Sequence, residues 1–341
     1  LNQNFKKIPN KGNEIFLLFG FSFLKFIPLL QNHNNVKILN WDVYYPQWNT
    51  FFKFYNFNIP YLKQKVISLI SKTYSFIFME KTALEISGLL GNGYTESHIV
   101  PLPVFIKQNM FLSRMNFSND LINIGYIGRA VDWKIYPLKK LLSDLEKIDK
   151  EFIIHIFTDD INYFYKKINH VKNVKILFYK NKYGDKLEEI INQKIDLGFS
   201  MGLSALEFAK FGIPTILADF STKEFFENYK YRWLKDTDNG NLGHDIYSIF
   251  YKRTENNRKS LNEIIYEYSS LKEKLSLETY QYVMEKHNIL KIIKELDNAI
   301  NKTKLYSFML KDNYFKFIAY LFNYKKIKIN LNINLLKNVI K

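Results

Sequence analysis

The sequence contains no cysteine, which excludes disulfide bonds and thiolate metal sites and agrees with a cytoplasmic setting. Its six histidines show no paired spacing of the kind that metal ligands favour. No apolar run approaches the roughly 18 uncharged residues that a membrane-spanning helix requires. These absences leave a chain of 341 residues, 47% of them hydrophobic, which is long enough for two domains with substantial cores. We therefore expect a cytoplasmic protein without a metal or a bound cofactor.

Arginine is scarce although the chain is strongly basic. The formal net charge is +16, yet only five of the 49 basic residues are arginine. Reading of nucleic-acid bases and forked phosphate contacts both favour arginine. The lysine excess therefore predicts a diffuse positive field that suits anionic substrates or an anionic membrane face, rather than a surface that reads nucleic acid.

From residue 121 onward, short apolar runs alternate with amphipathic segments. The runs are LINIGYI, FIIHIFT, VKILF, IDLGF and PTILA. Runs without polar alternation are typical of strands covered on both faces, so they predict an α/β fold with a doubly wound parallel sheet. The first helix is expected over about residues 134–148, with one apolar face formed by Leu138, Leu141, Leu142 and Leu145.

A shorter set of the same kind comes first in the chain. EIFLLFG, VKILNWD, YSFIFME and HIVPLPV predict four strands, with helices over 60–72 and 80–88. We expect the first apolar run, IFLLFGFSFL, to form a buried strand followed by a helix. VPLPVF, at 100–105, predicts an extended linker. Because many doubly wound lobes have six or more strands and this chain begins at Leu1, we expect the first lobe to lack a leading portion.

Residues 198–217, GFSMGLSALEFAKFGIPTIL, predict a strand, a glycine turn, a helix of about three turns and a second strand. A helix that starts after Gly202 offers the backbone amides of Gly202, Leu203 and Ser204, together with the positive end of its dipole, to a phosphate. Ser200, Ser204 and Glu207 are spaced to share one face of that helix.

Glu207 is the one carboxylate in this apolar helix. One turn beyond a bound phosphate, it could accept hydrogen bonds from the vicinal hydroxyls of a ribose. The alternative is an ion pair with Lys210, three residues later, on a solvated edge.

GYIGRAVDWK, at 125–134, leaves the carboxyl end of a predicted strand, where ligands of such sheets gather. Gly128 lets the backbone approach a ligand, and Arg129 and Lys134 could neutralise a diphosphate. The alternative for Arg129 is a helix cap or a pair with Asp132.

These two stretches resemble the nucleotide-sugar half of GT-B glycosyltransferases. The shared elements are a glycine–arginine loop followed by a lysine, and a G-x-S-x-x-E helix that ends in G-I-P. The resemblance is greatest to glycosyltransferase family 4 and its bacterial cell-surface polysaccharide relatives. It covers about residues 120–300 well and 14–105 loosely.

The resemblance implies roles for individual residues. Arg129 and Lys134 would bind the donor diphosphate, Glu207 would bind the ribose, and Tyr179 would lie in the segment that faces the base. The first glutamate of the family's E-x7-E motif is replaced by Phe199, so the family's donor-hexose contact is missing. The implied donor site is Gly128, Arg129, Lys134, Tyr179, Gly202, Leu203, Ser204 and Glu207.

Asp42, in NWDVYYP, is expected at the end of a strand, where it resembles the H-D element that many such enzymes carry near the acceptor. It is a candidate general base or sugar contact, and the alternative is a capping role. Asp236 and Asp238 imitate a metal-binding D-x-D, but KDTDNGN is typical of a turn. Asp159 and Asp160 are expected to cap the next helix. The predicted catalytic residues are Asp42, Arg129 and Lys134.

We predict three parts: an acceptor-side lobe at 1–105, a nucleotide-sugar lobe at 106–275, and a crossing helix with a basic tail at 276–341. One long amphipathic helix is expected over 276–300. The tail, rich in aromatic residues and lysine, could lie on an acidic bilayer or pack against the first lobe.

The predicted function is transfer of a sugar, with a UDP-sugar as donor, to a glycan or lipid-linked acceptor in cell-surface polysaccharide synthesis, at the inner face of the membrane. The alternatives are a nucleotide-sugar epimerase of the same fold and a basic nucleic-acid-binding protein.

Overall fold

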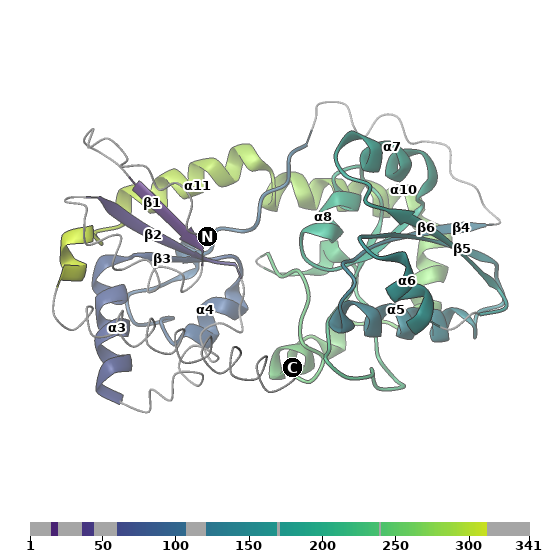
Figure 1. The fold of residues 1–341 in the computed structure, drawn as a ribbon, viewed down its shortest axis with the longest axis horizontal. Coiled ribbons are helices and arrows are strands. Elements are labelled where there is room, and N and C mark those ends of the chain that lie inside the picture. Colours follow the sequence, from purple (N-terminus) through teal and green to yellow (C-terminus); the bar gives the residue numbers. More distant parts are fainter. Residues whose placement is uncertain are drawn as a thin grey trace, which may run out of the picture. The chain divides into compact units, whose positions relative to one another are not determined.

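The structure is a computed structural model that describes residues 15–19, 36–43, 60–106, 121–168, 171–238 and 240–311. The chain divides into two compact units. The first unit comprises Leu1–Val100 with Ile293–Lys341, and the second comprises Pro101–Ile292. Each unit contains its own parallel sheet, as expected from the apolar runs (Figure 1).

The described sheet of the first unit has the order β1-β2-β3, with all neighbours parallel. Its strands are β1 (Ile15–Phe19), β2 (Lys37–Asp42) and β3 (Phe76–Phe78). The described helices of this unit before residue 101 are α3 (Pro60–Thr73), α4 (Lys81–Ser87) and the 3-10 turn η1 (Glu96–His98). The predicted helices over 60–72 and 80–88 are thus confirmed.

Two predictions for this sheet are wrong. The run at 15–19 does form a strand, but it lies at the edge of the described sheet, with 42% of Ile15 and 54% of Phe19 exposed. The helix expected after it lies outside the described residues. HIVPLPV does not form a strand, since only Ile99 bridges to β3, and the two prolines that follow cannot donate ladder hydrogen bonds.

The sheet of the second unit has the order β6-β5-β4-β7-β8, again all parallel. All five predicted strands are present: β4 (Ile122–Ile127), β5 (Phe152–Thr158), β6 (Val174–Lys180), β7 (Leu197–Ser200) and β8 (Thr215–Leu217). The helices between them are α5 (Asp132–Leu145), α6 (Ile161–Lys167), α7 (Asp185–Lys194) and α8 (Leu203–Ala209).

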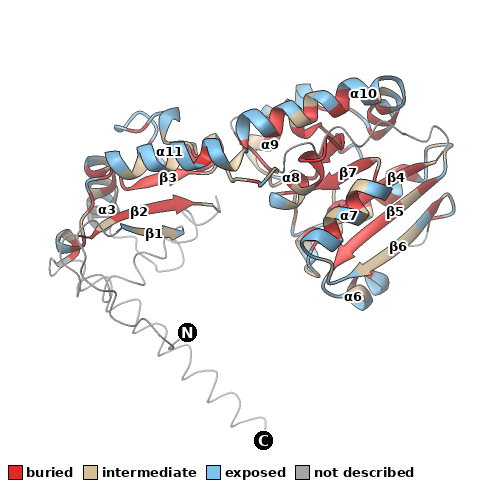
Figure 2. Ribbon diagram, turned by 90° about the horizontal axis from the view of Figure 1, so that it is seen from above, coloured by how far each residue is buried: buried red, intermediate tan, exposed pale blue. Residues whose placement is uncertain are grey.

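Helices cover both faces of this sheet, which explains why its strands lack polar alternation. On one face α5 and α6 pack in a core cluster with alternate residues of β4 and β5, and on the other face α7 and α8 pack against Phe157 (Figure 1). The predicted apolar face of α5, which includes Leu138 and Leu142, is buried. Figure 2 shows that β4, β5 and β7 are mostly buried, whereas the outer strand β6 is only partly covered.

The helix expected over 276–300 is in fact two helices, α10 (Leu261–Lys286) and α11 (Ile289–Lys302). The break holds buried His287, whose Nδ1 lies 2.7 Å from the carbonyl oxygen of Leu102, and the backbone of Val104 hydrogen-bonds on both sides of the break. The remaining short elements are η3 (Leu234–Asp236), α9 (Ile249–Arg253), η4 (Glu255–Asn257) and η5 (Ser307–Lys311). Most of the predicted basic tail lies outside the described residues.

Candidate functional site

The loops after β4 and β7 begin next to each other at the carboxyl edge of the second sheet, because these two strands are parallel neighbours. Ser200, at the end of β7, forms two hydrogen bonds to the end of β4. Its Oγ accepts from the amide of Ile127 at 3.0 Å and donates to the carbonyl oxygen of the same residue at 3.3 Å. Ser200 is therefore a buried residue of β7 and does not share a helix face with Ser204 and Glu207, contrary to the prediction.

The turn after β7 requires glycine. Gly202 has φ +63° and ψ −148°, a conformation that L side chains rarely adopt. Its amide donates to the carbonyl oxygen of Leu242 at 2.9 Å, so this amide is not available to a ligand, contrary to the prediction. Leu203 and Ser204 open α8, and as in any helix their amides have no acceptor inside it.

A pair of glycines lets α8 approach the sheet. Gly125 of β4 and Gly198 of β7 lie opposite each other in register. A Cβ at Gly125 would come within 2.5 Å of the Phe208 ring, and one at Gly198 within 2.9 Å of the Phe208 side chain. The ring of Phe208 thus occupies the space that both glycines leave, which sets the position of α8.

Glu207 forms an ion pair with Lys210. This is the contact that the alternative interpretation predicted, but Lys210 is buried and the pair does not lie on a solvated edge. The two side chains are 2.7 Å apart, and Lys210 is buried, with its ammonium also 2.7 Å from Glu188 of α7. A third of the Glu207 side chain stays exposed. Glu207 is therefore held by a buried cation while its side chain stays partly exposed.

The loop after β4 exposes Arg129. Asp132, the alternative partner predicted for Arg129, instead forms an ion pair with Lys167 and accepts a hydrogen bond from the Tyr163 hydroxyl at 2.7 Å. Among the described residues Arg129 forms no ion pair, so its guanidinium remains available to an anion.

Lys134 lies in the first turn of α5 and is buried, with 8% of the residue exposed. Its Nζ lies 4.9 Å from the centre of the Trp133 ring, and no carboxylate of the described part of the chain pairs with it. Burial, with a contribution from the positive charge of Arg129, lowers the pKa of Lys134 to about 7. A buried cation beside a second cation favours binding of an anion, which would raise this pKa.

Neighbouring residues hold this loop in place. Asp159, expected to cap a helix, accepts instead from the amide of Ala130 at 2.8 Å, whereas Asp160 caps α6 as predicted. A Cβ at Gly128 would come within 2.7 Å of the Tyr126 ring, and the Tyr126 hydroxyl donates to the carbonyl oxygen of Lys134. Gly128 is thus needed for packing against Tyr126. Sequence reasoning gave no role to Tyr126.

Tyr179, at the end of β6, stacks on Phe157 with ring centres 4.8 Å apart, and its hydroxyl lies 3.0 Å from Nδ1 of His155. These contacts favour a packing role for its ring. Phe199 is fully buried and packs near Tyr126 and Tyr231, with ring centres 6.0 and 6.2 Å away. The position that corresponds to a glutamate in the family that the sequence resembles therefore belongs to the core.

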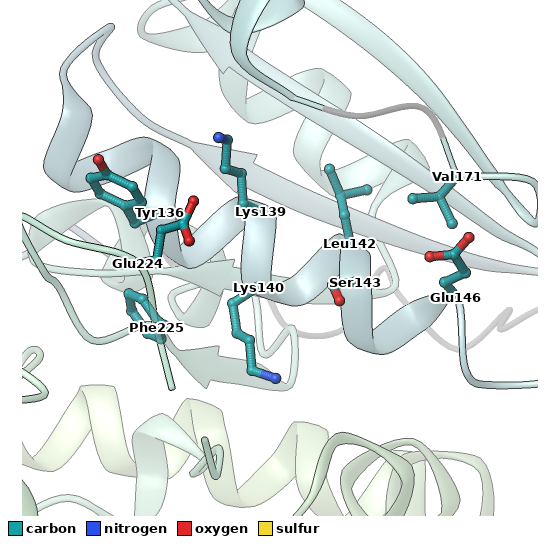
Figure 3. Close-up of a pocket in the computed structure, with 9 residues that line it drawn as sticks. All are labelled: Tyr136, Lys139, Lys140, Leu142, Ser143, Glu146, Val171, Glu224 and Phe225. Atoms are coloured by element: carbon teal, nitrogen blue, oxygen red, sulfur yellow. The ribbon is translucent and has the colours of Figure 1, made fainter. Parts of the chain in front are cut away.

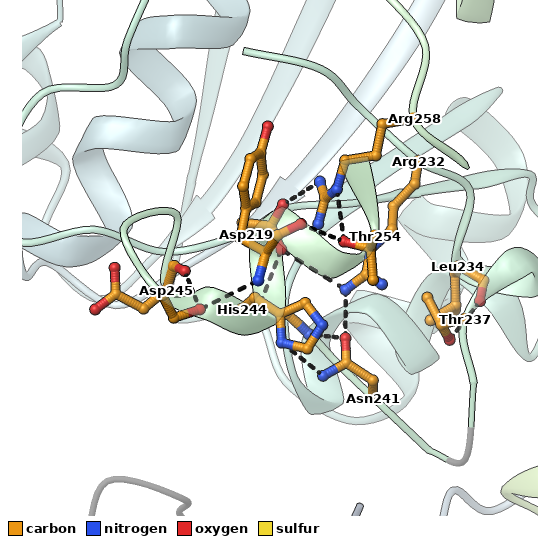
Figure 4. A network of polar contacts seen from close by, with 12 residues as sticks. Asp219, Arg232, Leu234, Thr237, Asn241, His244, Asp245, Thr254 and Arg258 are labelled. Carbon is orange, nitrogen blue, oxygen red and sulfur yellow. Dashed lines mark hydrogen bonds and ion pairs between the residues drawn. The ribbon is translucent and has the colours of Figure 1, made fainter. Parts of the chain in front are cut away.

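A buried ionic network follows β8, and sequence reasoning missed it (Figure 4). Asp219 accepts from Nη1 of Arg258 at 2.5 Å, from the Tyr229 hydroxyl at 2.8 Å and from the backbone amide of His244 at 2.8 Å. Arg232 lies 3.7 Å from the same carboxylate and donates to Asn241.

This network supports the glycine turn of the site. Asn241 is followed by Leu242, whose carbonyl oxygen binds the Gly202 amide. Burial alone would raise the pKa of Asp219, but Arg258 and Arg232 lower it to about 2. The sequence offered one sign of this network: arginine is scarce, and two of the five arginines, Arg232 and Arg258, belong to it.

Asp42 ends β2 in the first unit, as predicted, and is fully buried. Beside it, the Trp41 indole donates to the carbonyl oxygen of Val100 at 2.9 Å.

A hollow of about 460 Å³ lies along the outer side of α5. Figure 3 shows Tyr136, Glu224 and Phe225 at one end and Glu146 and Val171 at the other. None of the predicted donor residues lines it. The described residues contain no cluster of three or more histidine and acidic side chains that could hold a metal ion. Within the same residues, no helix has the length and apolar content needed to cross a bilayer.

Neither a family model nor a curated protein matches the sequence. Solved structures do match. A trehalose-6-phosphate synthase, studied for glycosyltransfer with retention, superposes with a TM-score of 0.50 at 12% identity over 85% of this chain and 74% of its own. A glycosyltransferase from Rickettsia africae gives a TM-score of 0.50 at 14% identity over 85% and 76%. The fold is GT-B.

The GT-B fold confirms the α/β prediction with two parallel sheets. S. aureus TarM, solved in complex with UDP, matches with a TM-score of 0.43 at 17% identity over 70% of this chain. This chain spans 46% of the length of TarM.

Proposed function

We propose that this protein is a glycosyltransferase that moves a sugar from a nucleotide diphosphate donor, with a UDP-sugar as first candidate. The observation that carries the proposal is Lys134, a buried ammonium beside Arg129 with no carboxylate partner in the described part of the chain. A diphosphate supplies the charge that this pair of cations requires. The GT-B fold supports a nucleotide sugar as its source, since trehalose-6-phosphate synthase carries out glycosyltransfer.

In the proposed reaction the bond between the anomeric carbon and the diphosphate breaks, and an acceptor hydroxyl takes the sugar. Negative charge grows on the leaving diphosphate, where Arg129, Lys134 and the amides of Leu203 and Ser204 stabilise it. Glu207 binds the ribose and so orients the donor. The cations and amides would do the work that a metal ion does in other transferases.

The acceptor half of the proposal rests on Asp42, at the carboxyl end of β2. As a general base it would take the proton of the acceptor hydroxyl, which requires that the acceptor reach a side chain that is fully buried in the structure; this burial favours the structural alternative. The diffuse lysine charge suits an anionic or membrane-bound acceptor, which favours a glycan or lipid-linked acceptor in cell-surface polysaccharide synthesis at the inner membrane face.

The test is incubation with UDP-sugars labelled in the sugar, with and without a lipid-linked acceptor fraction. We expect label to enter the acceptor, and to appear as free sugar by slow hydrolysis when acceptor is absent. Lys134→Met should abolish both. Conversion of the donor to an isomeric sugar nucleotide would contradict the proposal and favour an epimerase.

A further inference from the structure

Lys210 places its ammonium between two carboxylates from different helices. Its Nζ lies 2.7 Å from Oε1 of Glu188, in the first turn of α7, and 2.7 Å from Oε2 of Glu207, in α8. The lysine side chain is 4% exposed, whereas 33% of Glu207 is exposed. The lysine is therefore an internal group, and Glu207 is the member of this trio most open to a ligand.

This arrangement constrains the carboxylate of Glu207. Oε2 is engaged by the ammonium, and among the described residues Lys210 is the one partner of the Glu207 side chain. The second oxygen is therefore left to accept a hydrogen bond. A carboxylate that is already oriented loses less side-chain entropy when it binds a hydroxyl.

The charges point the same way. Without Lys210, the carboxylates of Glu188 and Glu207 would lie close together with no cation between them and would repel each other. With Lys210 in place, one negative charge is compensated, and the other is held where a hydroxyl donor can meet it. Glu188 contributes by fixing the ammonium from the side of α7.

We propose that Lys210 is a positioning residue that orients Glu207 and thereby sets the preference of the site for ribose over 2′-deoxyribose. This inference rests on the proposed function, because it requires that Glu207 meets the ribose of a nucleotide donor. Lys210 itself does not touch the nucleotide.

The test is calorimetric titration of UDP and of 2′-deoxy-UDP into the wild-type protein and into Lys210→Met. We expect the wild type to prefer UDP by at least about tenfold, as for a site built to bind a hydroxyl. Lys210→Met should weaken UDP binding by roughly tenfold, the loss of about one charge-assisted hydrogen bond, and leave 2′-deoxy-UDP almost unchanged. Lys186→Met, an exposed lysine of α7, is the matched control and should behave as wild type.

Two further variants separate positioning from folding. Glu188→Gln keeps the Lys210–Glu207 pair but loses the second anchor, so it should lower the preference for UDP partway. Glu207→Ala should abolish the preference, and adding Lys210→Met to it should change the preference no further.

Equal weakening of both nucleotides by Lys210→Met and by Glu188→Gln would overturn the inference, since that is the effect of general damage to the fold. An unchanged preference in both variants would overturn it as well. A wild-type protein that binds no nucleoside diphosphate at all would instead refute the proposed function.

Discussion

At the scale of single residues, Lys134 is the most informative side chain, because it is buried and forms no ion pair with a carboxylate of the described residues; the Trp133 ring near its ammonium offsets only part of the cost of burial. Its ammonium is buried, lies over the Trp133 ring and is close to the positive charge of Arg129. Natural proteins retain such strain mainly at functional sites, where a ligand relieves it. Removal of the charge should therefore raise the stability of the free protein and weaken its binding of the donor diphosphate.

Lys134→Met tests that trade-off. We expect the melting temperature of the free protein to rise by a few degrees, because an uncompensated buried charge is lost while the apolar stem is kept. Binding of UDP should weaken at least about tenfold. Thermal denaturation and calorimetry measure the two effects. A lower melting temperature would show that Lys134 has a stabilising partner.

The pKa of Lys134 also predicts a pH dependence. With a pKa of about 7 in the free protein, the side chain loses its proton as pH rises above 7, and a bound diphosphate must restore that proton. UDP affinity should therefore fall between pH 7 and 9, a window above the titration of the phosphate itself, near pH 6. Stability of the free protein should rise over the same window, since the unfolded chain then binds more protons. Lys134→Met should show neither slope.

Asp219 is the opposite case, a buried charge with several partners. Asp219→Asn removes the buried carboxylate that Arg258 and Arg232 contact, and should lower the free energy of unfolding by about 3–5 kcal/mol. Because the pKa of Asp219 is about 2, against an ordinary value of 3.8, the carboxylate stabilises the fold above pH 3.8 and loses this effect as pH falls toward 2. The difference from wild type, measured by urea unfolding, should shrink over that range. Asp149→Asn, at an exposed acid, is the control and should be neutral.

At the scale of elements, α8 is placed by the glycines beneath it. Gly125→Ala should destabilise the protein by about 1–3 kcal/mol, since the new methyl group meets the Phe208 ring and Ile195. Combined with Phe208→Leu, the same change should cost less than the sum of the two single variants. Additive effects in urea unfolding would show that Phe208 does not occupy this space. Gly202→Ala, where space is open, should cost about 1–3 kcal/mol through the backbone alone, because φ +63° with ψ −148° is a region that only glycine populates readily.

The elements show what sequence patterns can and cannot predict. The five strands of the second sheet could be predicted from apolar runs such as FIIHIFT, because a strand that is buried on both faces is apolar at nearly every position. The break between α10 and α11 was missed because amphipathic spacing continues across His287, and the bonds that stabilise the break come from Leu102 and Val104.

The contacts of the candidate site could be predicted only in part, because many of them join distant segments. Arg129, Lys134 and Gly202 are marked by scarcity, charge and turn composition in one stretch each. The partner of Lys210 in α7, the support from Asp219 and the burial of Phe199 depend on contacts between distant segments, which composition and spacing do not record.

At the scale of the whole molecule, the formal net charge of +16 agrees with the proposed ligand, a small polyanion with an organic group on each side of its phosphates. A nucleotide sugar fits this description. A nucleic-acid-binding protein shares this charge, but such proteins bind through clustered basic side chains at the surface, whereas Lys134 is buried.

The most direct measurement is a calorimetric titration of the full chain with UDP, GDP, ADP and a generic DNA duplex, repeated with Lys134→Met and Glu207→Ala. We predict saturable binding of at least one nucleoside diphosphate, one molecule per chain, weakened in both variants. DNA should bind only weakly and with strong dependence on salt. Tight binding of DNA with no response to any nucleoside diphosphate would contradict the central claim.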